Sequence, residues 1–132
     1  QAFLHQPMIT ADPVTTHPRE SELTDAWWWT KDPSASLTLT PTRDQTPVGR
    51  VRGTITAPIC GTRPITLTLT SEGQEIKQTL IATPEQPTPF ELELPTPSVT
   101  PKTLTIFAPG PECEVAEDPR VRYAKVGNLQ TY

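Results

Sequence analysis

The stretch Ile65-Thr66-Leu67-Thr68-Leu69-Thr70 places an apolar side chain at each odd position and a threonine at each even position. Side chains alternate between the two faces of a β-strand, so this pattern predicts a strand with one buried and one hydrated face. Threonine is β-branched and favours strands on the hydrated face. The same alternation recurs at residues 36–40, 51–57, 90–94 and 104–108. The sequence therefore predicts a protein built from half-buried strands.

The 17 prolines, against only 6 glycines, argue against helices, because a proline inside a helix costs about 3 kcal/mol. Ser71-Glu72-Gly73-Gln74 is typical of a hairpin turn, and the proline-rich segment 83–89 separates two strands. Adding strands at 27–30 and 121–130 gives a total of about eight or nine. We predict an all-β, two-sheet antiparallel sandwich of the jelly-roll type with almost no helix.

The length of 132 residues suits one domain. Residues 1–25 hold apolar side chains without a clean period, so we expect an N-terminal arm or edge segment there. Residues 26–132 are expected to form the sandwich domain.

Several classes of partner are disfavoured by composition. The net charge of -4 comes without clustered Lys or Arg, which disfavours nucleic acid as a partner. Apolar stretches such as Leu80–Ala82 fall far short of the roughly 20 residues that span a bilayer, so no membrane span is expected in this chain. The two histidines and two cysteines lack metal-ligand spacing. We predict no metal and no cofactor.

Cys60 and Cys113 each follow a predicted strand, and their even number in a secreted-looking chain favours a disulfide between them. The acidic cluster beside Cys113 matches no calcium-loop spacing, so we expect it to be solvated. Its members are Glu112, Glu114, Glu117 and Asp118.

Short motifs along the chain resemble those of a known type of domain. They are His17–Glu20, Trp27–Thr30, Ala35–Leu39, Ile59–Pro64, Asp118–Arg120 after Cys113, and Val126–Leu129. Together they are similar to the carbohydrate-binding-module-like accessory β-sandwich on the extracytoplasmic side of bacterial membrane proteins of the glycosyltransferase type. The resemblance covers roughly Pro18 to Leu129. It implies that the two cysteines are paired.

The resemblance also implies a function and a location. We expect a non-catalytic domain of a cell-envelope protein that contacts glycan and assists envelope polysaccharide assembly. The periplasm, the cell wall or the cell surface would be its location. Its partner would be a cell-envelope glycan or another envelope protein.

The three consecutive tryptophans are the most informative candidates for a site. Strand alternation places Trp27 and Trp29 on one face and Trp28 on the other. We expect Trp27 and Trp29 to fill the core, and Trp28 to contact glycan with Tyr123 as a second aromatic. Asp118 and Arg120 are expected to pair across a turn at Pro119 in a structural role.

Catalysis is not expected, because His17 and Glu20 are accompanied by neither a nucleophile motif nor a second positioned carboxylate. The alternative to glycan binding is an assembly module. Such a module would dock a partner protein through a strand edge or the N-terminal arm.

Overall fold

The computed structural model describes residues 8–22, 25–40, 47–110, 113–115 and 118–131. This part of the chain contains twelve strands and no helix. The strands are β1 (Met8–Ala11), β2 (Glu20–Glu22), β3 (Asp25–Thr30), β4 (Ser34–Thr40), β5 (Val48–Thr56), β6 (Arg63–Ser71), β7 (Gln74–Ala82), β8 (Thr88–Ser98), β9 (Lys102–Phe107), β10 (Cys113–Val115), β11 (Asp118–Arg122) and β12 (Ala124–Thr131). Since no helix occurs among these residues, none of them forms a helix that could cross a membrane.

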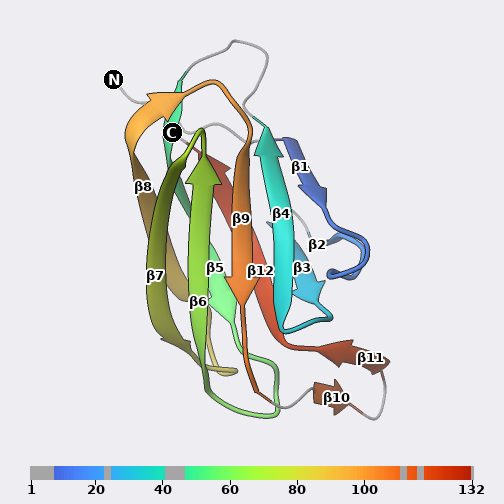
Figure 1. The fold of residues 1–132 in the computed structure, drawn as a ribbon. Coiled ribbons are helices and arrows are strands. Elements are labelled where there is room, and N and C mark those ends of the chain that lie inside the picture. Colours follow the sequence, from blue (N-terminus) through green and yellow to red (C-terminus); the bar gives the residue numbers. More distant parts are fainter. Residues whose placement is uncertain (1–7, 23–24, 41–46, 111–112, 116–117, 132) are drawn as a thin grey trace.

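Ten of the strands form two five-stranded antiparallel sheets that pack face to face (Figure 1). The first sheet has the order β1-β4-β9-β6-β7, and the second has the order β2-β3-β12-β5-β8. The remaining strands, β10 and β11, pair as a small ribbon at one end of the sandwich (Figure 1).

The strand order is that of a jelly roll. Of the eight strands left after the short β1, β2, β10 and β11, the second sheet holds the first, eighth, third and sixth in chain order. The first sheet holds the second, seventh, fourth and fifth. Two Greek keys wrapped on each other produce this order. The predicted two-sheet antiparallel sandwich is confirmed.

The core forms from the apolar positions of the alternating strands. In β6, Ile65, Leu67 and Leu69 are fully buried, while the threonines between them lie on the outer face of the first sheet. Val51 and Ile55 of β5 are likewise fully buried on the inner face of the second sheet. The hydrophobic effect of closing these two apolar faces on each other holds the sandwich together.

The segment before β3 contributes an edge strand to each sheet. β1 pairs with β4 in the first sheet, and β2 pairs with β3 in the second. Thr16 lies in the segment that links β1 to β2, and it forms an isolated bridge with Thr30 of β3. The division into an arm over residues 1–25 and a sandwich over 26–132 stays a prediction.

Lys102 is a fully buried cation at the start of β9. Its Nζ donates hydrogen bonds to the carbonyl oxygens of Ser98 and Thr100, at 3.0 and 2.8 Å, and to Ser98 Oγ at 3.2 Å. Burial lowers the pKa of Lys102, and the nearby Glu72 carboxylate acts in the opposite direction. The ammonium therefore ties together the turn between β8 and β9.

Candidate functional site

The three tryptophans of β3 divide between the core and the outer surface, with the faces opposite to those expected. Trp28 is 4% exposed and belongs to the core, where it lies across from the fully buried Val126 of β12. Trp27 and Trp29 are half-buried and lie on the outer face of the second sheet. The prediction that Trp28 is exposed for glycan contact while Trp27 and Trp29 fill the core is therefore wrong.

Cross-strand neighbours explain which way the strand faces. Residues directly opposite each other on paired strands share a face of the sheet. Trp29 lies opposite Lys125, and Trp27 lies opposite Gly127. A lysine and a glycine offer the core less apolar volume than Val126, so β12 turns Val126 and Trp28 inward. Alternation gave the correct grouping of the tryptophans, and the pairing with β12 determined which group is buried.

Two cations lie against the exposed indoles. The Nζ of Lys125 is 5.4 Å from the centroid of the Trp27 ring and 5.7 Å from that of Trp29. The guanidinium carbon of Arg122 is 5.1 Å from the Trp29 centroid. All three distances fall within the range of cation–π attraction. These contacts hold the two rings in place on the sheet.

Trp27 has a further anchor, and its neighbour on β12 is a glycine. Its Nε1 donates a 3.1 Å hydrogen bond to Glu20 Oε2, on the adjacent strand β2. On its other side, Gly127 contributes no side chain between Trp27 and Thr54. A Cβ at position 127 would lie 3.2 Å from the Trp27 Cβ and 3.8 Å from Thr54 Oγ1. Gly127 is buried, and a side chain at this position would crowd Trp27.

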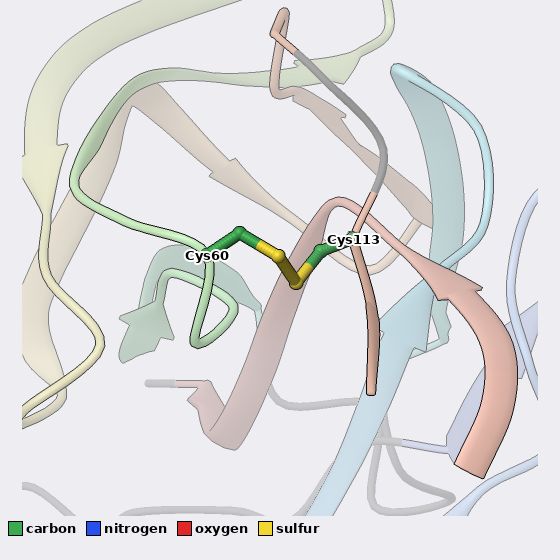
Figure 2. Close-up of a disulfide and its surroundings, with 2 residues drawn as sticks. All are labelled: Cys60 and Cys113. Atoms are coloured by element: carbon green, nitrogen blue, oxygen red, sulfur yellow. A yellow bond between two sulfur atoms is a disulfide. The ribbon is translucent and has the colours of Figure 1, made fainter. Parts of the chain in front are cut away.

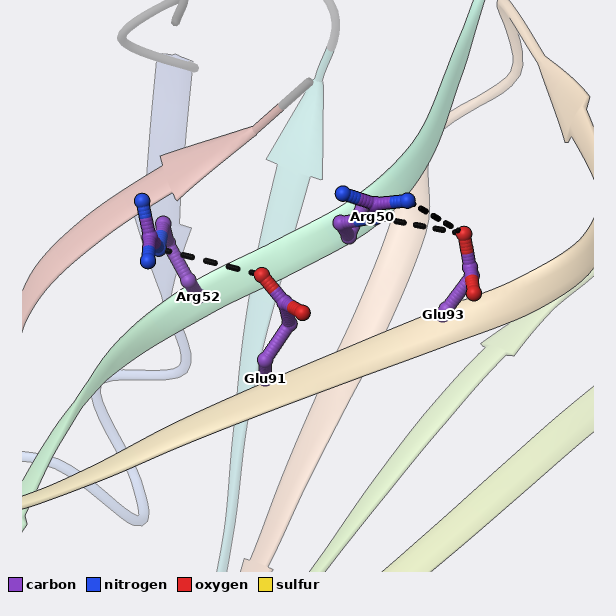
Figure 3. A network of polar contacts seen from close by, with 4 residues as sticks. All are labelled: Arg50, Arg52, Glu91 and Glu93. Atoms are coloured by element: carbon purple, nitrogen blue, oxygen red, sulfur yellow. Dashed lines mark hydrogen bonds and ion pairs between the residues drawn. The ribbon is translucent and has the colours of Figure 1, made fainter.

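Farther across the sheet, two cross-strand ion pairs join β5 to β8 (Figure 3). Arg50 Nη2 lies 2.8 Å from Glu93 Oε2, and Arg52 Nε lies 3.9 Å from Glu91 Oε1 (Figure 3). Both pairs stand on the outer face, because Val51 between the two arginines is fully buried. The positive charges of these two arginines are thus matched by carboxylates.

An open depression of about 460 Å³ adjoins the Arg52–Glu91 pair. Its polar lining consists of planar or hydroxyl-bearing groups that donate and accept hydrogen bonds. The lining residues are Arg52, Gly53, Thr54, Gln78, Pro89, Phe90, Glu91, Asn128 and Gln130. Asn128, with a φ of 53°, lies at the irregularity of β12 between Gly127 and Gln130.

We call the outer surface of the second sheet, from Trp27 and Trp29 across Gly127 and Thr54 to this depression, the tryptophan face. The depression also reaches Gln78 of β7, at the edge of the first sheet. Trp27, Gly127 and Thr54 are consecutive partners across β3, β12 and β5. Two strand spacings, roughly 10 Å, therefore separate the indole from the polar lining. The face combines flat aromatic surface at one end with hydrogen-bonding side chains at the other.

The other predicted site residues lie away from this arrangement or outside the described part. Tyr123 is half-buried and packs against the core, and its predicted role in glycan contact stays a prediction. Tyr123 also interacts with the buried Arg63. Burial lowers the pKa of Arg63, and the electrostatic effect of Tyr123 offsets part of that lowering. Asp118 and Arg120 belong to β11 rather than to a turn, and their side chains are outside the described residues.

The acidic side chains that were predicted to be solvated lie outside the part of the chain that the structure describes. These side chains are those of Glu112, Glu114, Glu117 and Asp118. Within the described residues, no group of three or more His, Cys, Asp or Glu side chains could hold a metal ion.

The predicted disulfide between Cys60 and Cys113 is confirmed (Figure 2). The Cα atoms lie 5.8 Å apart across a sequence separation of 53 residues. Cys60 lies in the loop between β5 and β6, and Cys113 begins β10. The bond therefore ties the β10–β11 ribbon to the sandwich. The same ribbon ends in Arg122, the residue that contacts Trp29.

Sequence reasoning missed Lys125 and Gln130 as candidate site residues. A signal for Lys125 was present, because Ala124 and Val126 alternate with Lys125 and Gly127 in the last strand. The positions of Asn128 and Gln130 depend on the irregularity in β12, which has no period-2 signature.

No protein-family model matches the chain, and no curated protein matches it. Among solved structures, the chain is similar to one described as PfGH50B, with 6% sequence identity and a TM-score of 0.55. That likeness covers 96% of this chain but 23% of the other, so this chain spans about a quarter of its length. It shows a shared fold. A second structure, described as TmCBM61 in complex with β-1,4-galactotriose, has 13% identity and a TM-score of 0.47 over 95% of this chain and 86% of that one.

Proposed function

We propose that the tryptophan face binds carbohydrate and that the chain is a non-catalytic glycan-binding module. The observation that supports this most is the pairing of two outward indoles with a polar depression on one sheet face. An indole offers a flat apolar surface with a polar edge, which suits the C–H face of a sugar ring. The amide, carboxylate and guanidinium groups of the lining suit hydroxyl groups.

The site is also held in place before a ligand arrives. Trp27 is fixed by its hydrogen bond to Glu20, and Trp29 by two cations. Arg52, in the lining of the depression, lies against the Glu91 carboxylate at 3.9 Å (Figure 3). Side chains that are already ordered lose less conformational entropy on binding. A weak, extended sugar ligand gains most from such preorganisation.

We place this activity outside the cytoplasm. A disulfide persists in oxidising compartments and is rare where thiols are kept reduced. The resemblance noted from the sequence motifs refines the proposal to a domain that contacts cell-envelope glycan during polysaccharide assembly.

The test is affinity electrophoresis through gels that contain a panel of neutral and acidic polysaccharides. The wild-type chain should be retarded by at least one polymer. Trp27→Ala and Trp29→Ala should each weaken that retardation by about tenfold, the size expected for an aromatic anchor. Thr68→Ala, on the outer face of the first sheet, is the matched control and should leave it unchanged. Failure to bind any polymer, or full retention by both tryptophan variants, would contradict the proposal.

A second candidate function rests on exposed apolar side chains of the first sheet. Ile81 of β7 is 58% exposed and Phe107 of β9 is 46% exposed. β7 is also an edge strand, to which a partner strand could add. An assembly module would show concentration-dependent self-association or partner binding that Ile81→Lys abolishes, with no response to polysaccharide. The lysine at position 77 of this edge protects it from pairing, which favours the glycan proposal.

A further inference from the structure

The role of Lys125 described below depends on the proposed glycan-binding function. Lys125 stands on the tryptophan face, within 6 Å of both outward indoles. No carboxylate among the described residues forms an ion pair with it. It therefore differs from Arg50 and Arg52 on the same sheet face, each of which lies against a glutamate.

The ammonium group of a lysine has three N–H donors. Its two ring contacts leave donor capacity for a third group. The guanidinium of Arg122 also lies against the Trp29 ring.

Among the side chains that the structure describes, the carboxylate of Glu20 lies on the far side of Trp27 from Lys125. Glu20 is on β2 and Lys125 is on β12, and these strands flank β3 on opposite sides. Glu20 Oε2 also accepts the hydrogen bond of Trp27 Nε1. An anionic group placed on the β12 side of the indoles would thus meet Lys125 first.

We propose that the glycan bound by the tryptophan face is acidic, with the carboxylate or sulfate of a sugar residue seated at Lys125. The sugar ring would contact the Trp27 and Trp29 indoles. The neutral part of the glycan would extend across Gly127 and Thr54 toward the polar depression. The acidic group is bound as a point charge, since an ammonium lacks the two-pronged geometry of a guanidinium.

The test compares acidic polysaccharides with their neutralised forms. The probes are polygalacturonate and its carboxyl-reduced derivative, and a sulfated galactan and its desulfated derivative. Wild-type protein should bind the acidic member of at least one pair about fivefold more tightly than the neutral member, the size of one well-placed ion pair. The preference should shrink as salt is raised from 50 to 500 mM, because ions screen the contact.

Lys125→Met retains the apolar stem against the indoles and should remove the preference, so that the acidic and the neutral member of the pair bind equally to this variant. Lys125→Arg keeps the positive charge and should retain most of the wild-type preference for the acidic polysaccharide. Lys77→Met removes the same charge from the first sheet and should have no effect. Equal binding of both members by the wild type, or a preference that survives in Lys125→Met, would overturn this inference and leave the proposed function intact. Failure to bind any neutral or acidic polysaccharide would instead overturn the proposed function.

Discussion

At the scale of single residues, Trp28 stabilises the fold from within the core, while Trp27 and Trp29 form part of the outer surface. Trp28 is 4% exposed and touches the core, whereas Trp27 and Trp29 are held by a hydrogen bond and by cations on the outer face. A buried aromatic contributes far more to folding than a half-exposed one, because its removal leaves a cavity. The core residue and the two residues proposed to bind glycan thus alternate along one strand.

Trp28→Ala should lower the free energy of unfolding by about 3–5 kcal/mol. Trp29→Ala should lower it by about 1 kcal/mol, since it loses partial burial and cation–π contacts. Chemical denaturation of the two variants measures both values. A Trp29→Ala variant that is destabilised as much as Trp28→Ala would show that Trp29 is the core residue.

At the scale of elements, the strands follow from the sequence better than their partners do. Alternation located β4, β5, β6, β8 and β9, because each needs one apolar and one hydrated face. It could not orient β3, where all of Trp27–Trp29 are apolar, and it did not reveal the β10–β11 ribbon, whose three-residue β10 has no readable period. Orientation and pairing depend on contacts between residues far apart in the chain.

Gly53 illustrates such a contact in β5. A Cβ there would lie 2.8 Å from Leu129 Cδ2 and 2.9 Å from both the Gly127 oxygen and Phe90 Cζ. These distances are shorter than side chains tolerate, so the second sheet must shift to accept any side chain.

Gly53→Ala should therefore cost about 1–3 kcal/mol of unfolding free energy. Gly49→Ala, in the same strand, is the matched control, because its Cβ would lie at least 3.1 Å from its nearest neighbour, Pro97. Thermal or urea unfolding gives both values. A control variant that is destabilised more than Gly53→Ala would contradict the packing described for β5, β8 and β12.

At the scale of the whole molecule, a disulfide cross-links the β10–β11 ribbon to the loop between β5 and β6. The sequence was sufficient to predict this bond and the sandwich fold, because two cysteines and repeated period-2 strands leave few other solutions. It was insufficient for the tryptophan face, because that face is assembled from β3, β5, β8 and β12. Side chains such as Trp29, Lys125 and Arg52 meet there only after the jelly roll has closed.

Replacing both cysteines by serine should lower the free energy of unfolding by about 4 kcal/mol, from the restored entropy of a loop closed over 53 residues. Denaturant titration of the double variant beside the wild type measures the difference. Thiol titration of the unfolded, unreduced wild type should find no reactive thiol. Equal stabilities, or two titratable thiols, would show that the Cys60–Cys113 bond does not form in the protein.

We propose that the indoles of Trp27 and Trp29 contact the glycan and that the buried indole of Trp28 does not. The chain has three tryptophans, and thus three indole N–H signals in a ¹H–¹⁵N correlation spectrum. Titration with an oligosaccharide of the polymer that retards the protein should shift the Trp27 and Trp29 signals and leave the Trp28 signal in place. Saturable binding that moves the Trp28 signal alone, or none of the three, would contradict the assignment of the tryptophan face.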